Sequence, residues 1–413
     1  MSVPETATTF IPLSAPEIRG NAWRYVKECL DTGWVSSVGE YVNRFEGMIT
    51  EAVGAPAAVA TCNGTSALHI ALLVSGVRPG DEVLVSTLTF IAPVNAIRYV
   101  GAWPVLIDAE RQFWQMDPEK LRDFLKNNCQ YTQGELRNRK SGRPVRAILP
   151  VHILGHPAEM HAILSIAGEF GLAVIEDATE CLGAKYRGVN VGSTGQIACF
   201  SFNGNKIITT GGGGAIVTSN LEWATKARYL TTQAKDDSIE FVHGEIGYNY
   251  RLTNIQAALG CAQLEMLAEY IEKKRAIAAR YQEALHEIPG VTLMREAPWA
   301  RSIFWMYTIL IEEEQFGMSA RAALNKLASK DIQTRPLWQP MHLSPAHRDC
   351  EAFRCETADW LHARALSLPC SVGLAESDQD FVIESLRSLS SSSKHRLEHR
   401  STPRAIFSDV QRG

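Results

Sequence analysis

Three short segments of the chain carry residue types that could act together on one small molecule. The first, Asn63-Gly64-Thr65-Ser66, directly precedes the apolar helix-like stretch ALHIALL, and a glycine with two hydroxyl groups at a helix start suits a phosphate. The second, Val174-Ile175-Glu176-Asp177, ends a buried strand-like run with two carboxylates. The third presents Lys206 in a loop after a strand-like run ending near Ser201, and four glycines follow at 211–214.

Taken separately, each segment has an ordinary structural explanation. The first would serve as a helix N-cap, Asp177 as a cap or a metal ligand, and Lys206 as a solvated surface charge. Together they match what pyridoxal phosphate needs: an amine to bond its aldehyde, a carboxylate to keep its ring nitrogen protonated, and donors for its phosphate. Phe90, just after a strand-like run, could stack on the ring, although core packing would explain it as well.

The composition is that of a globular protein and excludes several kinds of partner. Of the 413 residues 46% are hydrophobic, which excludes wholesale disorder. The formal net charge of −4 argues against a nucleic-acid binder and against attraction to anionic membranes. The nine cysteines form no CxxC pair, so we expect reduced, mostly buried thiols in a cytoplasmic protein instead of disulfides or a zinc site.

Two further patterns bear on location. The first twenty residues lack the basic and apolar regions of a secretion signal. The stretch from Ala52 to Val77 has no charged residue, but Pro56, Asn63 and His69 interrupt it. Its apolar runs are far shorter than the roughly 20 residues of a membrane helix. We therefore expect a buried interior segment and no membrane span.

From residue 57 onward, short apolar runs alternate with helix-like stretches. Strands that are apolar on both faces and alternate with helices predict an α/β fold with a mostly parallel sheet covered on two sides. Ligands of such folds gather outside the carboxyl ends of the strands. The strand-like runs are 82–86, 103–107, 147–151, 172–176, 197–202 and 215–218, and the helix-like stretches are 66–75, 91–100, 118–126 and 159–170.

The pattern divides the chain into four parts. Residues 1–252 are expected to form a large domain that opens with a helix at about 15–31. A long connecting helix is expected over 253–290, because Thr253-x-x-Gln256 is a capping-box signature and Pro289-Gly290 marks the latest possible end. Residues 291–389 predict a smaller α+β domain, with FWMYTILIE strand-like and 320–329 helical. Residues 390–413, which begin with SSSS, are expected to be a disordered terminus.

From about residue 9 to 385 the sequence resembles the DegT-type sugar aminotransferases, a pyridoxal phosphate-dependent branch of the aspartate-aminotransferase fold (fold type I). The order and number of the matching stretches make the resemblance specific. They are NGTSALHIAL, GDEVLVSTLTFIAPVNAI, VHILGHP, IEDATECLGAKYRG, the FSFNGNK…GGGG block and GYNYRLTNIQAALG.

The resemblance implies a role for each candidate residue. Glu180 falls where many members carry Gln or His beside the ring hydroxyl, and this departure leaves its role open. Members that dehydrate sugars carry His at the position of Lys206, so transamination is the expected outcome. The implied roles are Lys206 as the covalent amine, Asp177 as the ring-nitrogen partner, Phe90 as the stacking residue, Gly64, Thr65 and Ser201 as phosphate contacts, and Asn249 as a phosphate contact from the second subunit of a homodimer.

The implied reaction moves an amino group from an amino acid, by resemblance L-glutamate, to the C4 keto group of a nucleotide-linked 4-keto-6-deoxy sugar in polysaccharide or glycan biosynthesis. The segments IEDATECLGAKYRG and SFNGNKIITTGGGG are together most similar to those of members that aminate C4 of UDP-linked 4-keto-6-deoxy-N-acetylhexosamines. GDP- or dTDP-linked keto sugars are the alternative. A non-catalytic sensor or scaffold is a second alternative, and its mark would be loss of Lys206 or Asp177.

Weaker signals concern metals and the sugar. His152 and His156 stand four apart, but they flank Gly155 on a turn and not on a helix face, so no metal is expected. Trp338 and His342, in RPLWQPMH, resemble a family segment that lies over the site, and they could touch the sugar nucleotide or simply pack as a lid. The chain has no GxGxxG after its first strand and no Walker A pattern, which argues against a nicotinamide oxidoreductase or a P-loop enzyme.

Overall fold

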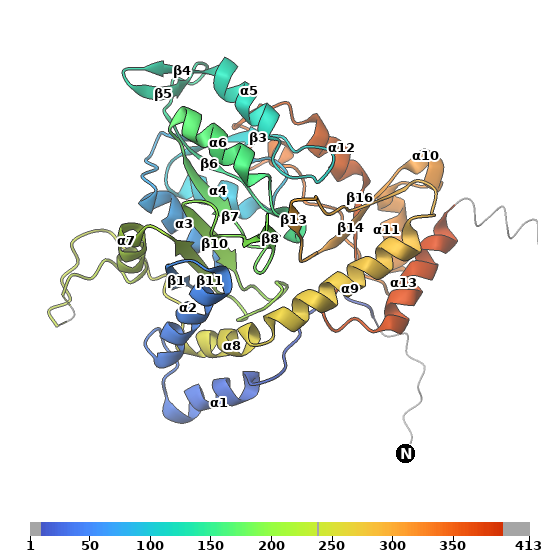
Figure 1. The fold of residues 1–413 in the computed structure, drawn as a ribbon, viewed down its shortest axis with the longest axis horizontal. Helices are drawn as coiled ribbons and strands as arrows, with labels where there is room; N and C mark the ends of the chain where they lie inside the picture. Colours follow the sequence, from blue (N-terminus) through green and yellow to red (C-terminus); the bar gives the residue numbers. More distant parts are fainter. Residues whose placement is uncertain (1–9, 238, 391–413) are drawn as a thin grey trace, which may run out of the picture.

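The computed structural model describes residues 10–237 and 239–390, and its centre is an eight-stranded sheet (Figure 1). Five of the seven neighbouring strand pairs are parallel, so the predicted mostly parallel sheet is confirmed. Both antiparallel pairs involve the strand after the glycine run. In spatial order the strands are β1 (Ala57–Thr61), β11 (Gly214–Thr218), β10 (Ile197–Ser201), β7 (Ala173–Asp177), β6 (Val145–Leu149), β2 (Glu82–Ser86), β3 (Trp103–Ile107) and β15 (Glu351–Phe353).

Both faces of this sheet are buried. Along β2, Val83 and Val85 belong to one cluster of buried residues and Leu84 belongs to the other. Burying an aliphatic side chain of this size stabilises the fold by about 1.5–3 kcal/mol, so packing on the sheet holds the helices in place. The helices on the first face are α3 (Gly64–Val74) and α4 (Ile91–Tyr99), and those on the second are α5 (Pro118–Asn128) and α6 (Met160–Phe170).

Two helices precede the sheet. Helix α1 (Ala22–Thr32) begins later than the expected opening helix, which was placed at about 15–31. Helix α2 (Glu40–Val53) was not anticipated, although Phe45 and Ile49 are four apart and fully buried, as one helix face requires. Further along the chain, α7 (Leu221–Thr231) follows β11.

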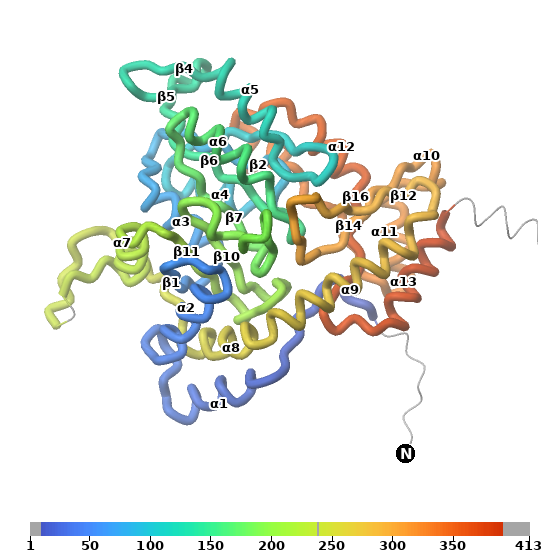
Figure 2. Tube along the Cα trace, in the orientation of Figure 1, coloured from blue at the N-terminus to red at the C-terminus, as the bar shows by residue number. Residues whose placement is uncertain are grey.

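The single long helix expected over 253–290 is two helices, α8 (Asn254–Leu264) and α9 (Leu267–Leu285). The predicted capping box of Thr253 and Gln256 is present at the start of α8. The break follows from what each helix packs against, because α8 packs on α1 and α2, whereas α9 crosses to the C-terminal part of the chain (Figures 1 and 2). Glu265, at the junction, accepts hydrogen bonds from Tyr25 of α1 and Arg44 of α2.

The C-terminal part contains a small antiparallel sheet of β12 (Val291–Leu293), β14 (Tyr307–Ile311) and β16 (Ala365–Leu368). The strand expected within FWMYTILIE is β14, and the helix expected at 320–329 is α11 (Ala320–Ala328). Strand β15 departs from the expected division of the chain, because it lies beyond residue 291 and yet pairs with β3 in the large sheet. The division into domains at residue 291 stays a prediction.

The terminus 390–413, predicted to be disordered, lies outside the described residues apart from Ser390.

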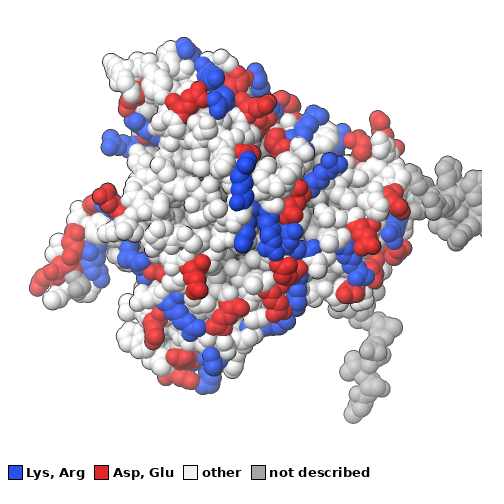
Figure 3. Space-filling view, viewed as in Figure 1, with Lys and Arg blue, Asp and Glu red and all other residues white. Residues whose placement is uncertain are grey.

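The cysteines, the helices and the surface charges bear on the other expectations from composition. All nine cysteines are free thiols and six of them are buried. Among the described residues, no helix combines the length and the apolar character needed to cross a bilayer. In the face shown in Figure 3, Lys and Arg side chains gather near the centre, acidic and basic side chains lie side by side along the lower and right parts, and a broad area left of the centre carries few charges. The remaining elements are β4 (Cys129–Thr132), β5 (Glu135–Asn138), η1 (Ile153–Gly155), β8 (Lys185–Tyr186), β9 (Val189–Asn190), β13 (Ala300–Arg301), α10 (Glu313–Phe316), η2 (Met341–Leu343), α12 (Glu356–Arg364) and α13 (Glu376–Leu389).

Candidate active site

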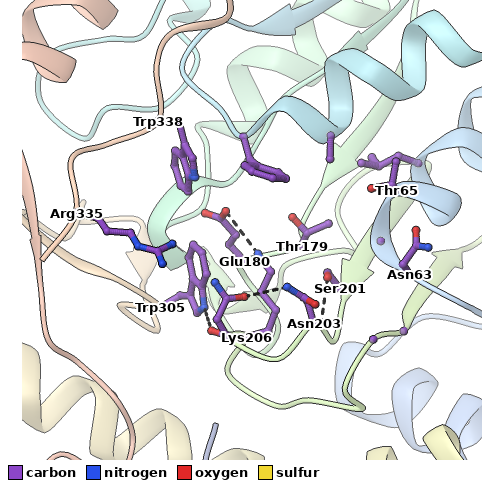
Figure 4. A pocket seen from close by; sticks show the side chains of 17 residues that line it. Asn63, Thr65, Thr179, Glu180, Ser201, Asn203, Lys206, Trp305, Arg335 and Trp338 are labelled. Carbon is purple, nitrogen blue, oxygen red and sulfur yellow. Dashed lines mark hydrogen bonds and ion pairs between the residues drawn. The ribbon is translucent and has the colours of Figure 1, made fainter. Parts of the chain in front are cut away.

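A cavity of about 310 Å³ lies outside the carboxyl ends of the central strands, where an α/β sheet places its ligands (Figure 4). Its walls come from the start of α3, from the loops after β2, β7 and β10, and from two segments of the C-terminal part. Seven of the ten residues singled out in the sequence line it. These are Gly64, Thr65, Phe90, Glu180, Ser201, Lys206 and Trp338.

One end of the cavity is the N-terminus of α3. Asn63 caps this helix by accepting the Ser66 N–H at 2.8 Å, so the first-turn N–H groups and the positive end of the helix dipole face the cavity. A Cβ at Gly64 would lie 2.8 Å from Cβ of Ser201, so only glycine leaves this space open. The hydroxyl-bearing Thr65 and Ser201 line the same end. N–H groups, hydroxyls and an open cradle fit the phosphate of pyridoxal phosphate.

The loop after β10 carries Lys206 into the cavity. The N–H of Thr210 donates to Phe202 O at 2.9 Å and closes the loop at its base, where both residues are buried. The Lys206 Nζ atom lies 4.0 Å from the centre of the Trp305 ring. The indole N–H of Trp305 donates to Asn205 O at 2.7 Å, which fixes the ring beside the amine. The amine is therefore held within the cavity, and its side chain is only 12% exposed.

Asp177 lies behind the cavity wall, at the end of β7. Its backbone is bound on both sides, since its N–H donates to Pro150 O at 2.9 Å and its carbonyl accepts the His152 N–H at 3.0 Å. The carboxylate accepts the Thr179 N–H at 3.1 Å. The pKa of Asp177 is raised, because burial outweighs the hydrogen bonds of Thr179 and the charge of Lys206, which act in the opposite direction. A buried carboxylate under these influences suits the ring nitrogen of the cofactor, which needs a nearby negative charge.

Glu180 is the second acid of the site, and it lines the cavity. Its Oε1 atom lies 3.6 Å from Lys206 Nζ, and Oε2 accepts the Leu154 N–H at 2.8 Å. Burial raises the pKa of Glu180 to about 7, although the charge of Lys206 and the Leu154 hydrogen bond act in the opposite direction. The carboxyl therefore changes its protonation state near neutral pH.

Asn249 and His342 lie outside the cavity lining. Asn249 is exposed and forms an isolated antiparallel bridge with Thr232, so it takes no part in the site of its own chain. In the His342 ring, Nδ1 lies 2.9 Å from Thr87 Oγ1 and Nε2 lies 2.9 Å from Asp359 Oδ1, and its contact with the sugar stays a prediction. Both nitrogens are engaged within the chain.

The structure adds Trp305, Arg335 and Thr179 to the lining (Figure 4). Trp305 was hidden in a run that only indicated a strand, and Arg335 stood in a motif from which only Trp338 and His342 were chosen. The rings of Trp305 and Trp338 are nearly parallel, with centres 6.3 Å apart. The proximity of Arg335 to the pair Trp305 and Trp338 could not be recognised from local sequence, since these side chains meet only when the C-terminal part folds against the sheet.

His152 and His156 serve the packing of the turn. Nε2 of His152 lies 3.0 Å from Glu176 Oε2, and its Nδ1 accepts the Ala158 N–H at 2.9 Å. Nδ1 of His156 lies 2.8 Å from the following carbonyl oxygen, and its Nε2 accepts the Ala297 N–H at 3.0 Å. All four ring nitrogens are thus used within the chain. Among the residues the structure describes, no group of three or more His, Cys, Asp and Glu side chains could hold a metal ion.

Comparison with known proteins gives concordant matches. The DegT/DnrJ/EryC1/StrS aminotransferase family matches residues 16–387. EpsN of Bacillus subtilis (strain 168), named as a pyridoxal phosphate-dependent aminotransferase, is 38% identical over 384 residues, covering 91% of this chain and 95% of that protein. GDP-perosamine synthase of Caulobacter vibrioides is 39% identical over 379 residues, covering 91% and 97%. The crystal structure of a DegT DnrJ EryC1 StrS aminotransferase from Brucella abortus has a TM-score of 0.82 at 29% identity, covering 90% and 95%.

Proposed function

The chain belongs to the DegT/DnrJ/EryC1/StrS aminotransferase family and is a pyridoxal phosphate-dependent sugar aminotransferase of fold type I, and from that premise we propose that it transfers an amino group from L-glutamate to the C4 keto group of a nucleotide-linked 4-keto-6-deoxy sugar. The observation that carries this proposal is the Lys206 amine, held 3.6 Å from Glu180 in a cavity whose other end is the N-terminus of α3. The chain has both Lys206 and Asp177, whereas a non-catalytic scaffold would be expected to have lost one of them.

The residues of the site have separate tasks in this reaction. When bound, pyridoxal phosphate supplies an aldehyde that takes up the amino group and a protonated ring that accepts the electron pair left on the substrate carbon. Gly64 and Ser201 hold its phosphate, and Asp177 keeps its ring nitrogen protonated. Lys206 Nζ, the amine nearest to the reacting groups, would act as the general base that takes a proton from the substrate carbon and as the general acid that gives one back.

The substrates of this reaction are anions, and the cavity offers them a cation. Arg335 is exposed and lines the cavity beside Trp305. Within residues 10–237 and 239–390 its guanidinium has no acidic partner within ion-pair distance. A free guanidinium binds carboxylates and phosphates with two parallel hydrogen bonds, which suits the donor carboxylate and the diphosphate of the acceptor.

For the nucleotide, the relatives favour GDP. A GDP-perosamine synthase is 39% identical to this chain over nearly its whole length, and a second, from Escherichia coli O157:H7, is 37% identical over 377 residues. The UDP-linked acceptor expected from the resemblance of two segments has no comparable support. We therefore propose a GDP-linked keto sugar as the acceptor, with UDP- and dTDP-linked sugars as the competitors in the test.

We also propose that the working unit is a homodimer in the cytoplasm. Asn249 is exposed at the base of an arm, of which the structure describes residues 232–237 and 239–249, so it is free to reach a neighbouring subunit. The arm exposes four large apolar side chains, which a second copy would cover. These are Ile239, Phe241, Val242 and Ile246. Nine free thiols suit a reducing compartment.

Two measurements on the purified protein test the proposal. Addition of L-glutamate to the holoenzyme should shift the absorbance band of the bound cofactor, and an unresponsive band would contradict amino transfer from this donor. The glutamate-treated enzyme is then offered GDP-, UDP- and dTDP-linked 4-keto-6-deoxy sugars, and mass spectrometry detects the amino sugar. We expect the fastest product formation with the GDP-linked sugar. Faster turnover of either competitor would overturn the assignment of the nucleotide.

A further inference from the structure

A segment of the C-terminal part, residues 335–343, forms one wall of the cavity, and we call it the covering segment. It brings Arg335 and Trp338 to the cavity. Its first residue is paired with β16, since the N–H of Arg335 donates to Ser367 O at 3.2 Å and the Ser367 N–H donates back at 2.7 Å. In its middle, the carbonyl of Leu337 lies 3.0 Å from Nδ1 of His362 on α12.

The last part of the covering segment is attached to the large sheet through Thr87, directly after β2. The N–H of Met341 donates to Thr87 O at 2.8 Å, and Nδ1 of His342 lies 2.9 Å from Thr87 Oγ1. Thr87 is itself fixed, because its N–H donates to Ile107 O of β3 at 2.8 Å and it is fully buried. Three residues later the same loop carries Phe90, which lines the cavity from the other side.

The far side of the His342 ring is attached to α12. Nε2 lies 2.9 Å from Oδ1 of Asp359, and a ring that donates to this carboxylate can accept the Thr87 hydroxyl hydrogen at Nδ1. Helix α12 is anchored in turn, because the buried carboxylate of Asp108 at the end of β3 accepts the N–H groups of Thr357 and Ala358 at 2.9 and 2.8 Å. His342 therefore bridges two fixed points, one on each side of the covering segment.

We propose that His342 is a positioning residue, which ties the covering segment to the loop that bears Phe90 and thereby fixes the position of Trp338 in the substrate cavity. The sequence left two roles open for His342, a contact with the sugar or packing as part of a lid, and the structure shows both ring nitrogens within hydrogen-bond distance of side chains of the chain itself. The inference rests on the proposed function only in taking this cavity as the place where substrate binds.

Amide hydrogen exchange of the full-length holoenzyme, followed by mass spectrometry, tests the attachment without any substrate. Thr87→Val removes the hydroxyl at nearly constant shape, and His342→Gln loses the group that meets Thr87. We expect either change to raise the exchange rate in peptides covering 335–343 by about five- to ten-fold, as the loss of one or two hydrogen bonds would. Exchange in α3 should stay unchanged in both variants. In the control variant His286→Asn, whose histidine is exposed at the end of α9, exchange at 335–343 should equal that of the parent enzyme.

Kinetics provide the second readout. With Thr87→Val we expect the KM of the acceptor sugar to rise while kcat and the cofactor absorbance stay near those of the parent enzyme, because Trp338 is displaced and the reacting groups are not. His342→Asn, whose amide still reaches the position of Nδ1, should restore part of the loss seen in His342→Gln. Unchanged exchange at 335–343 in Thr87→Val would overturn the proposal. Loss of turnover in the His342 variants with unaltered exchange would also overturn it, because His342 would then act on the substrate itself.

The exchange measurement separates the two proposals. If none of the tested sugars is aminated, the proposed acceptor is wrong, yet exchange at 335–343 still decides whether His342 holds the covering segment.

Discussion

The Nζ atom of Lys206 lies 3.6 Å from Oε1 of Glu180, and the other oxygen of that carboxyl accepts the Leu154 N–H at 2.8 Å. The acid is thus held between the backbone of one turn and the amine of another. Because the pair is buried, the ionised carboxyl gains less from water than it would at the surface, and its pKa rises to about 7. This relationship gives the site a pH dependence that can be measured apart from turnover.

Replacing Glu180 with Gln should flatten the pH dependence of stability of the cofactor-free protein. The folded pKa, about 7, lies above the ordinary value of 4.5, so the folded state keeps a proton that the unfolded state has already lost. The free energy of unfolding should therefore fall as pH rises from about 4.5 to about 7, by up to about 3 kcal/mol, and Glu180→Gln should lack this fall. Urea unfolding at pH 5, 6, 7 and 8 measures it. Parallel curves for the two proteins would contradict the buried acid, and the exposed Glu222→Gln serves as control.

Lys206→Ala should abolish product formation without unfolding the protein. The Lys206 side chain makes one long ion pair, with Glu180, and lies over the Trp305 ring. Its removal leaves the Glu180 carboxyl without this partner, but that carboxyl can take up a proton and become neutral. Borohydride reduction followed by peptide mass spectrometry should find the cofactor attached to the peptide containing Lys206 in the parent enzyme and to no peptide in the variant. The exposed-lysine variant Lys226→Ala should behave as the parent. Normal product formation by Lys206→Ala would refute the assignment.

Gly64→Ala should weaken cofactor binding. The new methyl group would lie 2.8 Å from Cβ of Ser201 and 3.2 Å from Cγ2 of Thr179, so the phosphate cradle must shift to admit it. Overpacking of this kind costs about 1–3 kcal/mol, which, if lost from cofactor binding, corresponds to a loss of affinity of about five-fold to about a hundred-fold. Titration with pyridoxal phosphate, followed by quenching of tryptophan fluorescence, measures it. Gly47→Ala, where a methyl group meets nothing within 4 Å, is the matched control and should bind the cofactor normally.

His152→Leu should destabilise the protein by about 3 kcal/mol or more. Glu176 is fully buried and accepts from His152 at 3.0 Å, so the variant leaves a carboxylate without its ring partner in the interior. Chemical denaturation should show the loss, and the double variant His152→Leu with Glu176→Leu should recover part of it, because the isolated charge is then gone. A double variant that is less stable than the single one would contradict this account.

Local sequence was sufficient for the parts of the fold that depend on periodicity and caps. The strand-like run 103–107 became β3 without change, and the stretch 91–100 became α4 within one residue. The apolar pattern continues across the junction between α8 and α9, so only the different partners of the two helices reveal the break at Glu265. Strand β15 is invisible in the same way, because three residues of mixed burial become a strand only when β3 offers an open edge.

For the site, local sequence identified candidates at a helix start and at strand ends. Gly64 and Thr65 open α3, Asp177 and Ser201 end β7 and β10, and Lys206 lies in the loop after β10. Such residues can be found from local sequence, because the neighbouring residues already determine the backbone conformation at a strand end or a helix start. Packing of the C-terminal part against the sheet brings Trp305 and Arg335 to the same cavity and places both nitrogens of the His342 ring beside Thr87 and Asp359. These contacts join groups far apart along the chain, and their existence depends on how the C-terminal part packs against the sheet, which no local pattern encodes.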